Sequence, residues 1–118
     1  MQRSTILAAV LIAFLGATAN ASAQCNNPPI AHDDVYNMSA NTTLSIFDAD
    51  LDDNDHDPDG DPVSAFVAGP PSVGSFCGVG PTGVCYQPPS GFTGLVAIPQ
   101  DATDGCTTVG ADILVFVQ

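Results

Sequence analysis

Positive charge is almost absent from this chain of 118 residues. Arg3 is the only Lys or Arg, whereas all 13 acidic residues are aspartates, and the formal net charge is −12. Such a chain cannot neutralise phosphates, so nucleic acid is excluded as a partner. The same repulsion excludes anionic membrane surfaces. Cations and basic or neutral partners remain.

Long apolar runs are also absent, apart from one at the N-terminus. Residues 6–15 (ILAAVLIAFL) follow Arg3 and lead to small residues that end in ASA at positions 21–23. This order is typical of a secretory signal peptide. A membrane anchor, the alternative, needs about 20 apolar residues. We therefore predict a signal peptide at residues 1–23 and one domain at residues 24–118, located outside the cell or in the periplasm without membrane insertion.

Cysteines are few, and their number is even. Four cysteines in an exported chain predict two disulfides, for which three connectivities exist. A zinc site is the alternative, but the sequence has no C-x-x-C pair and only two histidines. Disulfides are therefore the favoured interpretation.

Helix signals are scarce after residue 23. All ten prolines and ten of the eleven glycines lie there and punctuate short runs rich in Val, Ile, Phe, Thr and Tyr, a composition typical of strands and turns. The expected strands fall within residues 30–36, 42–47, 62–69, 72–88 (two strands), 94–102 and 112–118. About seven short strands predict an all-β fold, an antiparallel β-sandwich of immunoglobulin-like type.

The last expected strand is apolar on both faces. Ile113, Val115 and Val117 alternate with Leu114 and Phe116. A strand of this kind is normally buried on both sides, whereas a sandwich strand has an outer face. Two interpretations remain open: a covered edge, or a contact surface for a neighbouring domain or a second copy of the chain.

The order of these landmarks resembles the bacterial cadherin-like, Ig-like modules found in tandem arrays in secreted and surface adhesins. NNPPIAHDDVY (residues 26–36) is similar to the opening of that family, and NDHDPDGDPVSAF (residues 54–66) is similar to its acidic loop and third strand. Residues 74–94 resemble its hairpin, and residues 101–117 its Asp-Gly loop and final strand. The resemblance covers nearly all of residues 26–118. It implies an Ig-like (cadherin-like) sandwich with calcium at one pole.

Two features depart from the family pattern. Pro99 and Gln100 stand where the sixth strand usually runs unbroken, and a proline there removes a ladder donor. We therefore expect a bulge or a strand shift at that point. The four cysteines are additions to the pattern.

An acidic loop carries the main chemical signal. Eight aspartates crowd into fourteen residues. They are Asp48, Asp50, Asp52, Asp53, Asp55, Asp57, Asp59 and Asp61. Calcium takes 6–8 oxygen ligands, and carboxylates spaced two apart along a loop can converge on one ion. The stretch from Asp55 to Asp61 begins like an EF-hand loop, but Phe66 stands where the bidentate Glu is needed, so an EF-hand is rejected.

Other loops supply further ligands at the same pole of an Ig-like sandwich. The expected calcium ligands are Asp55, Asp57, Asp59, Asp61, Asp104 and Asn27. Asp33 and Asp34 lie on an alternating strand, so at most one can face the site. The alternative is a solvated acidic loop that aids solubility.

The disulfide pairing follows from the same arrangement. Cys77 and Cys85 flank a turn and can meet across two paired strands. Cys25 and Cys106 would both lie at the acidic end. We expect Cys77–Cys85 and Cys25–Cys106.

Catalysis is not expected. His32 and His56 are the only imidazoles, and no nucleophile stands in a recognisable setting. The expected function is a secreted, calcium-stabilised module with a structural or adhesive role, whose partner is a protein or a surface glycan. The alternatives are a secreted small binding protein (an inhibitor or a carbohydrate-binding module) and a self-assembling surface subunit without calcium dependence.

Overall fold

The computed structural model describes residues 27–118, so the predicted signal peptide and Cys25 lie outside the described residues. The elements are β1 (Asp34–Met38), β2 (Leu44–Phe47), α2 (Asp48–Leu51), β3 (Ser64–Val67), β4 (Ser75–Gly80), β5 (Gly83–Gln87), β6 (Gly94–Thr103) and β7 (Thr108–Val117). The strands fall within or overlap the ranges predicted from the sequence. Among residues 27–118, no helix is long and apolar enough to cross a membrane.

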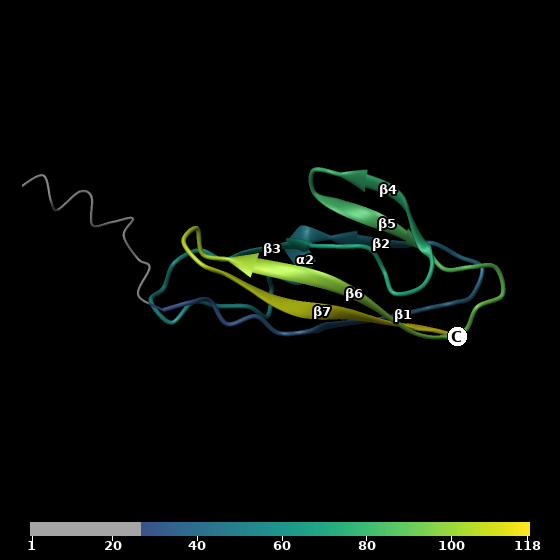
Figure 1. Cartoon of the computed structure of the whole chain (residues 1–118), viewed down its shortest axis with the longest axis horizontal. Coiled ribbons are helices and arrows are strands. Elements are labelled where there is room, and N and C mark those ends of the chain that lie inside the picture. Colours follow the sequence, from purple (N-terminus) through teal and green to yellow (C-terminus); the bar gives the residue numbers. More distant parts are fainter. Residues whose placement is uncertain (1–26) are drawn as a thin grey trace, which may run out of the picture.

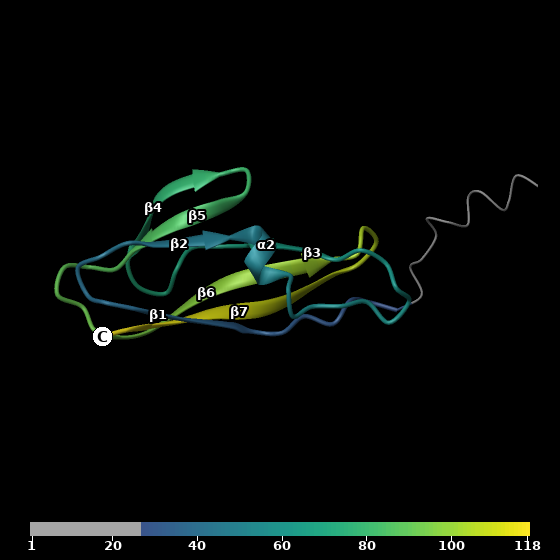
Figure 2. The same cartoon turned by 180° about the vertical axis from the view of Figure 1, so that it is seen from behind.

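The strands form two sheets that lie face to face (Figures 1 and 2). One sheet has the order β1-β7-β6-β3, and the other has the order β2-β5-β4. All neighbouring strands pair in antiparallel fashion except β1 and β7, which are parallel. This arrangement confirms the predicted Ig-like β-sandwich.

The core forms where the inner faces of the two sheets meet. Burial alternates along most of β6, with Val96 and Ile98 fully buried, as strand geometry requires. The opposite sheet contributes Ile46 and Tyr86, both also without exposed surface. The Tyr86 hydroxyl donates to the Val73 carbonyl oxygen at 2.7 Å, so the polar end of this core residue is satisfied.

The final strand is not an edge. β7 lies between β1 and β6, so the covered-edge interpretation is wrong. Its inner residues Ile113 and Val115 are fully buried. Its outer residue Phe116 is 40% exposed and pairs with Leu95, which is 53% exposed. The second apolar face of β7 therefore belongs to an open outer surface of the sheet.

The expected disruption at Pro99 is absent. β6 pairs with β7 in continuous register, including Pro99 opposite Asp112. The Pro99 carbonyl oxygen accepts from the Ala68 N–H at 2.8 Å. In an antiparallel strand the N–H and C=O of one residue face the same neighbour. The N–H that proline lacks would therefore face the segment after β3, so no hydrogen bond between β6 and β7 is lost.

The irregular pairing occurs instead at a cysteine. The β4–β5 register shifts between Phe76 and Gly78, which leaves Cys77 as an extra residue in β4. Cys77 forms the predicted disulfide with Cys85, and their Cα atoms are 5.1 Å apart. Cys106 is also disulfide-bonded. The predicted Cys25–Cys106 bridge includes Cys25, which lies outside the described residues.

The four-residue helix α2 was not expected from the sequence. Asp48 and Asp50 stand in its first turn, where carboxylates interact favourably with the helix dipole. Leu51 has no exposed surface and anchors the helix to the core. One turn is too short to show a helical period in the sequence.

Candidate metal centre

One end of the sandwich gathers three segments that are distant in sequence. We call residues 27, 55–61 and 104 the acidic pole; it lies at the end opposite the C-terminus, beside the β6–β7 turn (Figure 1). The Asn27 N–H and Nδ2 donate to the two carboxylate oxygens of Asp59 at 3.0 and 2.9 Å. Ile30 and His56 exchange two backbone hydrogen bonds, of 2.7 and 3.1 Å. The N-terminal segment is thus fastened to the acidic loop, as the sequence analysis expected.

A tight turn brings the loop carboxylates together. The Asp59 N–H donates to Asp57 Oδ1 at 2.7 Å, and the Gly60 N–H donates to the Asp57 carbonyl oxygen at 3.0 Å. Gly60 has a φ of 86°, a conformation that glycine adopts without steric cost. One carboxylate oxygen from each of Asp57, Asp59 and Asp61 lies within 4.8 Å of the others.

A second Asp-Gly turn adds Asp104. Its Oδ1 accepts from the N–H groups of Thr107 and Cys106, both at 2.8 Å. These two backbone bonds lower the pKa of the Asp104 carboxyl. The sequence analysis missed these two backbone donors, although the Asp-Gly pair at 104–105 signals such a turn.

The carboxyl groups at this end affect one another electrostatically. Partial burial raises the pKa of Asp61, and the charges of Asp57, Asp59 and Asp104 raise it further. Like charges this close repel one another in the folded protein. The residues of the acidic pole contain no Lys or Arg that could offset them.

The acidic pole also holds carboxylate oxygens that lack hydrogen-bond donors. The Oδ2 atoms of Asp55, Asp57, Asp61 and Asp104 are buried and without a hydrogen-bond partner. Asp57 is the most enclosed of these residues, with only 8% of its surface exposed. A buried charged oxygen without a donor is costly. A hard cation can be coordinated by such oxygens and offsets their charge.

The predicted ligands are not all placed alike. Asp57, Asp59 and Asp61 form the cluster, and Asp104 lies near enough for its charge to act on Asp61. Asp55 lies to one side. Its Oδ1 accepts a hydrogen bond from the His32 N–H at 2.8 Å. The pKa of Asp34 is raised first by burial and further by the charge of Asp55. Asn27 gives its donors to Asp59 and so positions that carboxylate.

The paired aspartates at the start of β1 turn to other partners. Asp33 Oδ1 accepts from the Asp112 N–H at 2.8 Å. Asp34 Oδ2 accepts from Gln100 Nε2, also at 2.8 Å, and Gln100 is 2% exposed. Gln100 Nε2 also donates to the Asp112 carbonyl oxygen at 3.1 Å, so the amide nitrogen of this core residue is satisfied, whereas its Oε1 is buried without a hydrogen-bond partner. Both aspartates are thus engaged by groups outside the cluster.

Comparison with known proteins places the chain by family. A family model described as a bacterial Ig domain matches residues 26–114. No curated protein matches the chain. Among solved structures, a chain described as an endo-fucoidan hydrolase from glycoside hydrolase family 107 is similar over 80% of this chain, with 13% identity and a TM-score of 0.47. The present chain spans only 14% of that structure's length.

Proposed function

The chain belongs to the bacterial Ig domain family, and from this membership we propose that it is a secreted, calcium-stabilised module with a structural or adhesive role outside the cell. The observation that carries the calcium proposal is the set of buried carboxylate oxygens without donors on Asp57, Asp61 and Asp104. The proposal includes no catalytic step.

The donor set favours calcium over other metals. The cluster offers carboxylate oxygens on two loops, which suits a cation that takes 6–8 oxygen ligands in a flexible geometry. Magnesium demands a stricter octahedron. Zinc and copper favour imidazole or thiolate ligands, whereas His32 and His56 are exposed and stack on each other with ring centroids 6.3 Å apart.

The position of the site supports a structural role. Calcium on Asp57, Asp61 and Asp104 would join the acidic loop to the β6–β7 turn. Asn27, which holds Asp59, would extend this joint to the N-terminal segment. A module with its N-terminal end fixed in this way suits a surface protein that presents a binding face to a protein or glycan partner.

The proposal is tested by thermal unfolding of the secreted protein in calcium and in calcium-free buffer at equal ionic strength. A ligand that binds only the folded state at 100 times its Kd stabilises it by about 2.7 kcal/mol. In a domain of this size each kcal/mol raises Tm by about 4–8 °C. Magnesium should restore the Tm only in part. Identical unfolding curves with and without calcium would contradict the calcium proposal.

Self-association is a second candidate function, and one observation favours it. The outer face of the β1-β7-β6-β3 sheet exposes Val35, Leu95 and Phe116 by 58%, 53% and 40%. Apolar side chains on adjacent strands form a surface of the kind that marks protein contacts. Size-exclusion chromatography with and without calcium tests it: an assembled species that is lost in a Phe116→Ser variant supports this role, and a monomer at all concentrations excludes it.

A further inference from the structure

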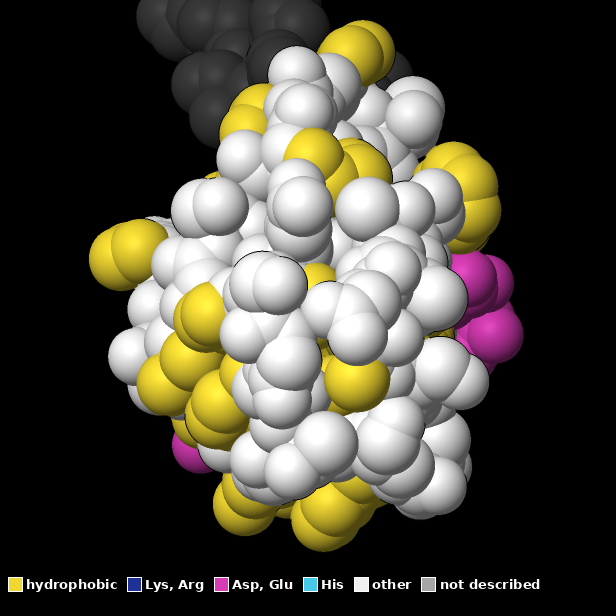
Figure 3. Space-filling model, turned by 90° about the vertical axis from the view of Figure 1, so that its right-hand side faces the viewer, with side chains coloured by type: hydrophobic (Ala, Val, Ile, Leu, Met, Phe, Trp, Pro, Cys, Tyr) yellow, Lys and Arg dark blue, Asp and Glu magenta, His cyan; other side chains and the backbone are white. Residues whose placement is uncertain are grey.

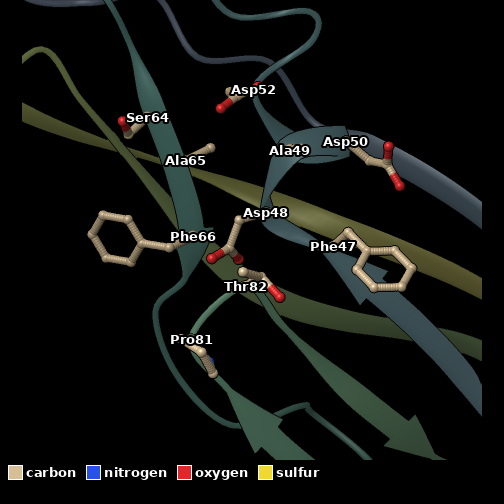
Figure 4. Close-up of a pocket in the computed structure, with 10 residues that line it drawn as sticks. All are labelled: Phe47, Asp48, Ala49, Asp50, Asp52, Ser64, Ala65, Phe66, Pro81 and Thr82. Atoms are coloured by element: carbon tan, nitrogen blue, oxygen red, sulfur yellow. The ribbon is translucent and has the colours of Figure 1, made fainter.

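A cavity of about 660 Å³ lies between α2, β3 and the turn of the β4–β5 hairpin (Figure 4). It is separate from the proposed calcium cluster, because none of Asp57, Asp59, Asp61 and Asp104 lines it. We call it the α2–β3 pocket. The residues on which its chemistry depends are Phe47, Asp48, Asp52, Phe66, Pro81 and Thr82.

The walls of the pocket are apolar and open to solvent. Phe47 and Phe66 are 52% and 39% exposed, although each follows a buried residue, Ile46 or Ala65, in its strand. In Figure 4 the two aromatic side chains lie on opposite sides of Asp48 and their rings point away from it, with Thr82 and Pro81 below. The two phenylalanines therefore border the pocket and leave the Asp48 carboxylate open between them.

The charge inside the pocket is negative and unbalanced. Burial raises the pKa of Asp48, and the charge of Asp52 raises it further. Burial also raises the pKa of Asp52, as do the charges of Asp53 and Asp55, against a hydrogen bond from the Ala65 backbone. A cation in the pocket would relieve this repulsion. Residues 4–118 contain no Lys or Arg to provide it.

We propose that the α2–β3 pocket binds a lysine or arginine side chain presented by a partner protein. The cationic head would lie at Asp48 and Asp52, and its aliphatic stem along the apolar surface that Phe66 and Pro81 contribute. Apolar surface covers such a stem while the charged head reaches its partner. A bare metal ion does not fit as well, because five of the ten lining residues (Phe47, Ala49, Ala65, Phe66 and Pro81) are apolar and suit an aliphatic stem. A second copy of residues 4–118 cannot be the partner, because it has no Lys or Arg.

The pocket is tested with three short peptides that differ only at one central residue: arginine, lysine or uncharged citrulline. Backbone amide shifts of the isotopically labelled protein are followed by NMR at saturating calcium. We expect saturable shifts at Asp48, Phe66 and Thr82 with the two cationic peptides only. Asp48→Asn should weaken binding about fivefold, the equivalent of about 1 kcal/mol for a partly exposed ion pair. Phe66→Ser, which removes apolar surface from the border of the pocket, should weaken it at least about twofold.

Asp112→Asn is the matched control, because it removes the same charge from an exposed residue that neither lines the pocket nor acts on the pKa of Asp48 or Asp52. It should leave the affinity unchanged. Equal weakening by Asp48→Asn and Asp112→Asn, equal binding of the citrulline peptide, or no saturable shift would each overturn the proposal. The titration is repeated without calcium. Binding that persists without calcium supports the pocket independently of the calcium proposal. Thermal unfolding verifies that each variant is folded.

Discussion

The two ends of the sandwich differ in how their hydrogen-bond acceptors are satisfied. At the end that holds the C-terminus, the loops donate hydrogen bonds to one another, whereas at the acidic pole several buried carboxylate oxygens have no donor. We call residues 39–43, 88–93 and 118 the neutral pole; it contains no Asp, Lys or Arg. Figure 3 views the molecule from this end, where uncharged side chains dominate and acidic ones appear only at the margins. The Ala40 N–H donates to the Gln118 carbonyl oxygen at 2.9 Å, and the Gly91 N–H donates to Asn41 Oδ1 at 2.9 Å.

The acidic pole has the opposite balance. Asp57 and Asp104 each use one carboxylate oxygen to accept backbone N–H groups and leave the other buried without a donor. The two ends therefore illustrate two ways to close one fold. A loop whose acceptors all have donors needs no ligand for its stability, whereas a loop with surplus carboxylates would gain stability from a cation bound from solution.

The largest effect is expected from removing the surplus carboxylates. Asp57→Asn combined with Asp61→Asn should abolish most of the calcium stabilisation, about 4.1 kcal/mol at 1,000 times the Kd. The same variant should be more stable than the natural sequence without calcium, because less like charge is gathered at the pole. Thermal unfolding at two calcium concentrations measures both changes.

Asn41→Asp provides the matched control at the neutral pole. It adds one charge, keeps the acceptor for the Gly91 N–H, and suits the φ of 62° at that position. Its calcium response should equal that of the natural sequence. A calcium response that survives in the Asp57/Asp61 double variant would show that the ion binds elsewhere.

A somewhat smaller effect is expected at the β4–β5 hairpin, away from both poles. Replacing Cys77 and Cys85 by Ser should reduce stability by roughly 2–3 kcal/mol, the value that the chain-entropy model gives for so short a loop. The loss should be the same with and without calcium, because the disulfide and the acidic pole share no residue. A loss that depends on calcium would show that the hairpin and the pole are coupled.

The sequence predicted most of the fold because the signals for it are local. Alternation in β6 and β7 marks the inner face, and Pro and Gly mark the turns. The position of the acidic pole also followed, because the Ig-like order of strands places the Asp55–Asp61 loop and Asp104 at one end. Strand positions that followed from alternation, and the gathering of these loops that followed from topology, were correct.

The missed features depend on contacts between distant residues. The cost of Pro99 depends on which neighbour its missing N–H faces, and that neighbour is the segment after β3. The place of β7 inside its sheet depends on parallel pairing with β1, which spacing does not reveal. The α2–β3 pocket likewise depends on residues from both sheets, because Phe47 in β2 and Phe66 in β3 border it.

The smallest expected effect is a response to pH, which needs no substitution and arises from carboxyl groups outside the neutral pole. Burial raises the pKa of Asp34, Asp48 and Asp52 above the ordinary 3.8, so the folded protein holds protons that the unfolded chain has lost. Their contribution to stability is complete below the unfolded pKa and is lost as the pH rises through the folded values. These groups are partly exposed, and water therefore screens the effect. The neutral pole has no titratable side chain and contributes nothing.

Without calcium, the Tm should consequently rise as the pH falls from 7 toward 4.5. Asp104 acts in the opposite direction, because its lowered pKa gives stability that is lost only as the pH falls below about 3.8. With calcium the Tm should fall over the same range, since protons compete with the ion for the carboxylates. Thermal unfolding across this range in calcium-free and calcium buffers should give two curves that converge on acidification. Parallel curves would mean that calcium does not act through the carboxylates of the acidic pole.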